Sequence, residues 1–368
     1  MRGRINFVIG AVVCLTLTSL HASFAQERDA APPSQGEIII YNLAQAGLMY
    51  EFNSYEDYGT VQARIGQARA EIEAARATGV YSGYKDSANV GVLPADLFYA
   101  LPGEKSNSFI KIGGFGNWNY RDKNQTQVYS RAGRIELEYL NAPTQDMLLG
   151  IGVFTEKQMV DFIHNDGYTE DLGYGIRGDF VQKFNPYWGM AARVEYFWAD
   201  GKTRIPLGGG LKYGYDQDWN RAYSQLSLVG SFTQQSLNFL PQAWVFHPTL
   251  RAAYQGNHYN DVQDSFGQTV NGTVGPNDAY MMITATAKFE NADLRPGNIA
   301  PMIEIGVNQE LKNDLNEIVD DPTSIHSSLG ASVNFGGGAL MNVAYTRNDG
   351  LKGERRDQAL TIHFGFLY

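Results

Sequence analysis

Cysteine is almost missing from this chain of 368 residues, which contains one, at Cys14. Long apolar runs are missing too. After residues 7–20 no run reaches the 18 or more apolar residues that a membrane-spanning helix needs. Excess positive charge is also missing, because 39 acidic residues outnumber 29 basic ones. These absences argue against a disulfide-stapled fold, a helical membrane protein and a nucleic-acid-binding protein.

The first 25 residues have the three parts of a secretory signal peptide. Arg2 and Arg4 precede an apolar stretch over residues 7–20, and Ser23 and Ala25 supply the small residues of a cleavage site before Gln26. Cleavage would change the formal net charge from −10 to about −12 and leave no thiol in the mature chain. A chain without thiols fits the oxidising periplasm and the outer membrane.

The C-terminal stretch 357–368 alternates strictly between apolar and other residues. Its apolar positions are Leu360, Ile362, Phe364, Phe366 and Tyr368. A period of two is typical of a β-strand with one apolar face. The pattern fits an edge strand of a soluble sandwich. It also fits the strand that closes an outer-membrane barrel, since an open edge in lipid would leave backbone groups unpaired. In the second case these five residues form an assembly signal.

Similar alternation recurs through the chain from residue 107 onward, between stretches rich in turn residues. The predicted strands are about 107–120, 127–140, 145–163, 172–184, 187–199, 219–232, 242–258, 279–291, 299–311, 324–336, 338–347 and 357–368. Twelve is an even number, as in single-chain bacterial barrels, and fourteen is the other possibility. The predicted fold is therefore all-β, a transmembrane antiparallel up-and-down barrel of about 12 strands with an N-terminal α-helix.

The connections between these segments alternate in length. Tight turns are predicted at 141–143, 185–186, 295–297 and 336–338, and longer loops at 200–218, 259–278 and 312–323. In barrels of this kind short turns face the periplasm and long loops face outward. The alternation predicts that both ends of the barrel segment lie on the periplasmic side.

Within each predicted strand, charged residues alternate with apolar ones. On 127–140, for example, Ile135 and Leu137 alternate with Arg134 and Glu136. Charge on the lipid face costs about 2–4 kcal/mol for Arg or Lys at the midplane, so the charges should face the lumen. The predicted pore-lining residues are Lys111, Arg134, Glu136, Glu138, Arg177, Asp179, Arg193, Glu195, Arg251, Lys288, Glu290, Glu304 and Glu310.

Residues 26–106 form a short leader before the barrel segment 107–368. Its stretch 37–41 is β-prone, and residues 79–106 contain the Gly and Pro of a connector. Between them, Glu56–Thr78 is rich in Ala, Arg, Glu and Gln, which favour a helix. The apolar stripe of this helix is too narrow to anchor in lipid. It would lie either inside a polar lumen as a plug or in the periplasm as a solvated stub.

With its strands placed, the chain resembles the translocator, or β, domain of autotransporters. The resemblance covers residues 109–368 and rests on FIKIGGFGNWNY (109–120), MLLGIGVF (147–154), YGIRGDF (174–180), GGGALMNVAYTRNDG (336–350) and ALTIHFGFLY (359–368). Two features depart from the family: no long passenger precedes the barrel, and the helix lacks the asparagine used by self-cleaving members. Residues 101–114 (LPGEKSNSFIKIGG) are similar to the entry into the first strand of some porins.

The resemblance implies an outer-membrane barrel with a polar pore. The alternative is a passive porin for small hydrophilic solutes. The implied partners are outer-membrane lipid, lipopolysaccharide and the barrel-assembly machinery, with no nucleic acid, no cofactor and no metal. His326 and Ser328 invite a third reading as an outer-membrane hydrolase, but strand parity turns both inward, away from acyl chains. The acidic stretch 314–321 could hold Ca²⁺, although it lacks regular ligand spacing.

Overall fold

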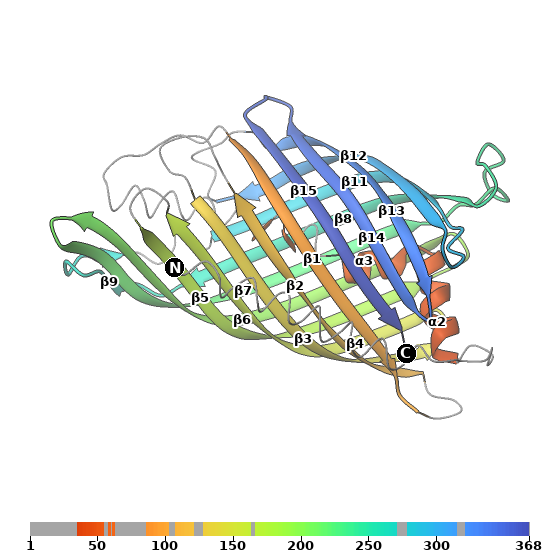
Figure 1. The fold of residues 1–368 in the computed structure, drawn as a ribbon, viewed down its shortest axis with the longest axis horizontal. Helices are drawn as coiled ribbons and strands as arrows, with labels where there is room; N and C mark the ends of the chain where they lie inside the picture. The colour runs from red at the N-terminus through yellow and green to blue at the C-terminus, as the bar shows by residue number, and fades with distance from the viewer. Residues whose placement is uncertain are drawn as a thin grey trace. The chain divides into compact units, whose positions relative to one another are not determined.

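The computed structural model describes residues 35–54, 58–59, 61–62, 86–102, 107–120, 128–162, 166–270, 278–314 and 321–367. In these ranges, thirteen strands close into one barrel (Figure 1). They are β1 (Asp86–Ala100), β2 (Ser108–Tyr120), β3 (Val128–Thr144), β4 (Met147–Phe162), β5 (Gly167–Lys183), β6 (Trp188–Gly208), β7 (Leu211–Gly230), β8 (Trp244–Tyr259), β11 (Asp278–Asn291), β12 (Ile299–Asn313), β13 (Thr323–Gly336), β14 (Ala339–Gly350) and β15 (Arg355–Leu367). A small hairpin, β9 (Val262–Gln263) with β10 (Thr269–Val270), lies outside the barrel sheet. Among the described residues, no helix has the length and apolarity to cross a membrane.

All twelve segments predicted as strands are strands of this barrel, which confirms the all-β class and the count of about twelve. Consecutive strands pair antiparallel around the wall. The closing pair is different, because β1 runs parallel to β15. The added strand β1 therefore starts at the end of the barrel opposite to the C-terminus. The predicted barrel segment 107–368, by contrast, starts and ends at one end of the barrel, because Ala100 pairs with Phe109 and Phe98 pairs with Leu367.

The additional strand is β1, which occupies a segment whose Gly and Pro predicted a connector. Its Gly91 leaves space for the neighbouring ring of Trp118 on β2, since a Cβ atom there would lie 2.3 Å from that ring. Its Pro94 lies where the paired register with β15 is interrupted, between Val92 and Ala95. A residue without an N–H is tolerated at such a gap. Both apparent strand breakers are thus accommodated by their neighbours.

The two ends of the barrel differ in their connections. At the end where the C-terminus lies, which we call the short-turn end, β13 and β14 join through Gly336–Gly338, whose φ angles of 79°, 58° and 80° favour glycine. At the opposite end, the long loop predicted at 200–218 is instead a hairpin, because β6 and β7 continue to residues 208 and 211. In this hairpin, Ile205, Tyr213 and Tyr215 are buried and pack against Phe162 and Val270 of neighbouring elements.

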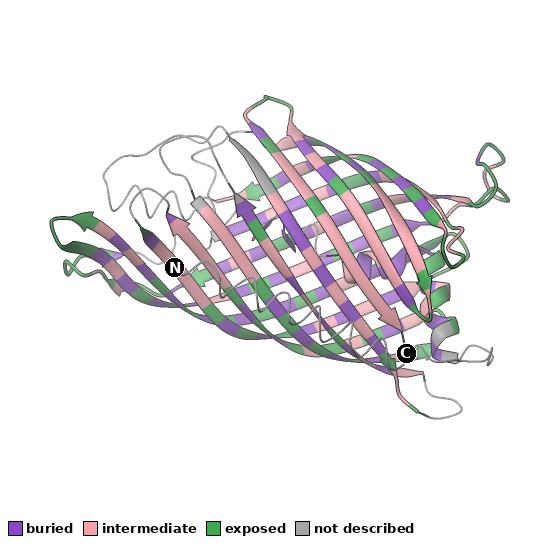
Figure 2. Cartoon of the chain, viewed as in Figure 1, coloured by how far each residue is buried: buried purple, intermediate pink, exposed green. Residues whose placement is uncertain are grey.

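Burial alternates along the wall, as Figure 2 shows for most strands. On β3, Ile135 is 65% exposed, whereas Arg134 and Glu136 are 3% and 2% exposed. β6 repeats the pattern with exposed Val194 and buried Glu195. The predicted strand parity is therefore observed: apolar side chains cover the outer face and charged ones the inner face.

Two short helices of the described part of the chain lie at the short-turn end, α2 (Gln35–Gln45) and α3 (Leu48–Asn53). The β-prone stretch 37–41 is therefore helical. Ile39 and Leu43, one turn apart, pack with Leu48 against inward-facing wall residues that include Phe109 and Leu148. This packing outweighs the weak β preference of the three consecutive isoleucines, because tertiary burial routinely overrides intrinsic propensity.

Candidate functional site in the barrel lumen

The inner face of the wall carries all thirteen residues predicted to line a pore. Twelve of them are buried, and Glu290 is half-buried. Buried charges need partners, because an isolated ion in a low-dielectric interior is strongly destabilised. The arrangement of these partners decides what the lumen can do.

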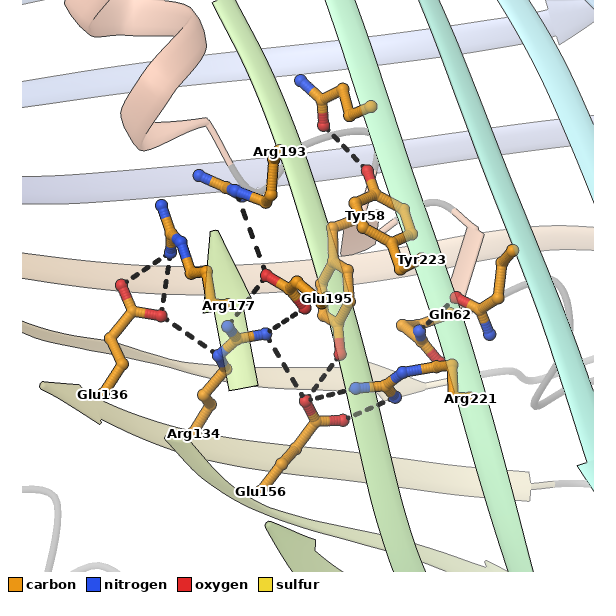
Figure 3. A network of polar contacts seen from close by, with 12 residues as sticks. Tyr58, Gln62, Arg134, Glu136, Glu156, Arg177, Arg193, Glu195, Arg221 and Tyr223 are labelled. Carbon is orange, nitrogen blue, oxygen red and sulfur yellow. Dashed lines mark hydrogen bonds and ion pairs between the residues drawn. The ribbon is translucent and has the colours of Figure 1, made fainter. Parts of the chain in front are cut away.

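A continuous ion-pair network spans β3 to β6 (Figure 3). Arg134 forms two hydrogen bonds with Glu195, at 2.8 and 2.9 Å, and a third with Glu136 at 3.1 Å. Arg177 donates to the same Glu136 at 2.8 Å, and Arg193 lies 3.3 Å from Asp179. Strands β3, β5 and β6 each supply both signs of charge, so the network ties these strands together on the lumen side.

A second part of the network lies further from the short-turn end. Arg221 on β7 forms a bidentate pair with Glu156 on β4, at 3.0 and 2.9 Å, and the hydroxyl of Tyr58 donates to the same carboxylate at 2.5 Å. Neither Glu156 nor Arg221 was predicted to line the lumen. The signal was present for Glu156, whose parity is opposite to that of the exposed Ile151 and Val153. Arg221 instead shares its parity and its inner face with Trp219 and Tyr223, so alternation with apolar residues did not reveal it.

The N-terminal segment occupies the lumen. Glu51 of α3 forms a bidentate pair with Arg251 on β8, at 2.8 and 2.9 Å. Burial alone would raise the pKa of Glu51, but the Arg251 guanidinium lowers it, and the resulting pKa lies below the usual range. On another part of the wall, Arg177 and Arg193 donate to the backbone carbonyl of Phe52. Helix α3 is therefore held by cations from three strands.

The segment continues lengthwise from α3. Of the predicted helix Glu56–Thr78, the structure describes Tyr58, Gly59, Val61 and Gln62, all of which are helical; the rest lies outside the described residues. Tyr58 contacts Glu156, nine residues along β4 from its short-turn end, and Gln62 hydrogen-bonds Gln255, eleven residues along β8. The described residues between 35 and 62 thus run from the short-turn end toward the end where β1 begins.

Comparisons with known proteins give a fold. The translocator domain of autotransporter NalP from Neisseria meningitidis has 10% sequence identity, a TM-score of 0.50, and coverage of 81% of this chain and 93% of its own. The fold resembles that of a translocator barrel. The β domain of the Bordetella autotransporter BrkA has 13% identity, a TM-score of 0.48, and coverage of 70% and 95%. The toluene transporter TodX of Pseudomonas putida has 9% identity, a TM-score of 0.37, and coverage of 65% and 76%. No protein-family model matches the chain, and no curated protein matches its sequence.

In this translocator-like barrel, His326 and Ser328 face the lumen and are buried, as predicted. His326 hydrogen-bonds Asn348 at 3.0 Å, and Ser328 accepts a hydrogen bond from Thr346 at 3.0 Å. Both partners belong to the neighbouring strand β14. Both side chains are therefore hydrogen-bonded residues of the barrel wall.

Two further histidines of the wall, His247 and His363, also have partners. His247 lies 2.9 Å from the carbonyl oxygen of Gly230 and 3.2 Å from Glu290. His363 lies 2.9 Å from Asp96. They are hydrogen-bonded wall residues, as predicted from their single inward positions.

Asp321, in the acidic stretch considered for Ca²⁺, accepts hydrogen bonds from the backbone N–H groups of Lys352 and Glu354, at 3.1 and 3.2 Å. It therefore ties two neighbouring loops together. In the described ranges, no group of three or more His, Cys, Asp or Glu residues is placed to hold a metal.

Proposed function

We propose that the chain forms a polar pore across the outer membrane of a Gram-negative bacterium and that its own N-terminal segment closes this pore. A closed barrel leaves no unpaired strand edge in lipid, and its apolar outer face matches a membrane. The observation that carries the proposal is the bidentate pair of Glu51 and Arg251, which fastens a segment of the chain inside the charged lumen.

The direction of this segment bears on the two functions considered for such a pore. If the short turns face the periplasm, Gln35 starts there, and the chain climbs outward before β1 begins. An N-terminal passenger displayed at the cell surface would need Gln35 at the opposite end. The geometry therefore favours a plugged pore with a translocator-like fold. A passive porin is the state that this barrel would reach if the segment left the lumen.

Conductance in planar bilayers tests the closure. Deletion of residues 35–62 should raise the single-channel conductance several-fold, since the segment occupies the lumen along much of its length. Leu43→Ala should increase the fraction of time open, because truncating a buried Leu costs about 2–5 kcal/mol. Tyr41→Ala is the matched control on the same helix, where the side chain is 60% exposed.

A tag placed at Gln26 tests the orientation. Accessibility to protease only after the outer membrane is permeabilised would support the plugged pore. Accessibility on intact cells would support a translocator arrangement and contradict the proposed one. An unchanged conductance after deletion of residues 35–62 would show that the segment does not close the pore.

A further inference from the structure

The carboxylate of Glu51 lies in a cradle built by three neighbouring strands of the wall. Arg251 on β8 binds it through Nε and Nη2, at 2.8 and 2.9 Å. Ser227 on β7, the register partner of Arg251, lies beside it, and Lys288 on β11 adds a second positive charge. The side chains of Arg251 and Glu51 are 2% and 3% exposed. The cradle is thus a desolvated, preformed receptor for one carboxylate.

The cradle belongs to the wall, whereas its occupant belongs to the N-terminal segment. Lys288 is fixed by Glu290 at 2.9 Å, and its ammonium also lies 4.0 Å from the ring centroid of Tyr50 on α3. These positions are set by strands that remain when α3 moves. Departure of α3 would remove the Glu51 carboxylate from the Arg251 guanidinium and leave Arg251 and Lys288 as two positive charges close together on the pore wall. Such a site attracts a solute anion.

The geometry selects a planar anion. An arginine binds a carboxylate side-on through two parallel N–H donors, and this fork adds specificity to charge attraction. The structure already shows the fork occupied in this way by Glu51. A neutral solute could not neutralise Arg251, and it would have to compete with an internal carboxylate held at very high effective concentration.

We propose that Arg251, Lys288 and Ser227 form a carboxylate-binding site in the pore, and that Glu51 occupies this site as an internal competitor. A solute that carries a carboxylate displaces Glu51, loosens α3 and so favours its own passage. This inference rests on the proposed function, since it names the class of solute that the plugged pore takes. In this proposal α3 does more than block the pore, because its Glu51 competes with the solute for the binding site.

Succinate binding to the full mature chain in detergent tests the site without requiring a membrane. Calorimetry at constant ionic strength should give binding to Glu51→Gln about tenfold tighter than to the wild type, because the internal competitor is lost. The double variant Glu51→Gln/Arg251→Gln should bind succinate at least tenfold more weakly than Glu51→Gln does. Glu170→Gln, which removes an outer-face carboxylate paired with Lys157, should match the wild type.

Three results would overturn the assignment. They are equal succinate affinities for the wild type and Glu51→Gln, an unchanged affinity in the double variant, or equally tight binding of uncharged succinamide. Tighter binding of inorganic phosphate than of succinate would also overturn the carboxylate assignment. A pore that conducts but does not bind succinate removes this site and leaves the proposed function standing. A chain that binds succinate but never conducts would support the site and contradict the proposed function.

A second measurement uses a chain that keeps Glu51, so that the proposal stays testable if Glu51→Gln does not fold. Ala46→Cys places a thiol at a buried position between α2 and α3, and Cys14, the chain's natural cysteine, lies in the predicted signal peptide. Succinate should speed labelling of this thiol by a polar maleimide several-fold, whereas succinamide should not. Identical labelling rates with both solutes would show that a carboxylate does not displace α3.

Discussion

Nε2 of His363 on the last strand lies 2.9 Å from Oδ2 of Asp96 on the first strand, across the parallel seam that closes the barrel. The other oxygen of Asp96 lies 3.3 Å from Nζ of Lys111 on β2. One buried carboxylate therefore joins β15, β1 and β2. A Cβ atom at Gly113 would lie 2.3 Å from Asp96, so the glycine leaves the space that this carboxylate needs.

Asp96→Asn should weaken the seam. The change removes the negative charge that both neighbours face, and a buried group that loses its partner costs about 1–3 kcal/mol. Lys111 keeps Glu136 at 2.8 Å, which limits the loss. The measurement is the temperature at which the unboiled barrel changes its mobility on a gel. We expect a lower temperature for Asp96→Asn and no change for Asp293→Asn in an exposed turn.

Arginine substitutions on the outer face of β4 should report depth in the membrane. Val153 is 57% exposed between Leu137 and Ile176 on the adjacent strands, whereas Met159 lies on the same face near the strand end. Val153→Arg should destabilise the barrel in lipid by about 2–4 kcal/mol, and Met159→Arg by about 0–1 kcal/mol. Urea titration in liposomes measures both. Equal losses would show that the lipid belt does not centre on Val153.

The strands and their faces could be predicted because alternation is a local property. Ile135 and Arg134 reveal their opposite faces within a few residues of sequence. The strand β1 could not be found in this way. Gly91 fits this strand because the ring of Trp118 packs against it. Pro94 fits because it lies where the pairing with β15 is interrupted.

The lumen could be predicted as a set of charges but not as a set of pairs. Parity places Arg134 and Glu195 on the inner face, yet their bidentate contact joins residues 61 positions apart. The pairing of Glu51 with Arg251 spans 200 positions, and no periodicity signals it. The short helix that carries Glu51 is defined by its packing against the wall, so it too lay beyond local reasoning.

Acidification should open the pore through Glu51. Its pKa is lowered in the closed state by Arg251, so closure gains stability from this pair above the ordinary glutamate pKa of about 4.3 and loses it as pH falls through the lowered value. Wild-type conductance should therefore rise below about pH 4. In Glu51→Gln the conductance should be high at pH 7 and should depend less on pH. Parallel pH profiles for the two chains would contradict a role for Glu51.

The C-terminal residues predicted as an assembly signal supply the final test. Leu360, Ile362, Phe364 and Phe366 lie on β15, where Leu360 is 48% exposed, and Phe366 pairs with Ala339 of β14. Tyr368 lies outside the described residues. Leu367, between them, packs toward the apolar cluster around α2.

Tyr368→Ala, or removal of residues 366–368, should lower the amount of folded barrel in the outer membrane. Weaker recognition during assembly and lost burial, worth about 1.5–3 kcal/mol for each large apolar side chain, both contribute. Tyr368→Phe should leave the yield unchanged, because the ring and not the hydroxyl is expected to matter. The measurement is the fraction of heat-modifiable protein in outer-membrane preparations, with degradation products followed in the periplasm. If the truncated chain folds with the yield of the wild type, the last strand is not the closing signal.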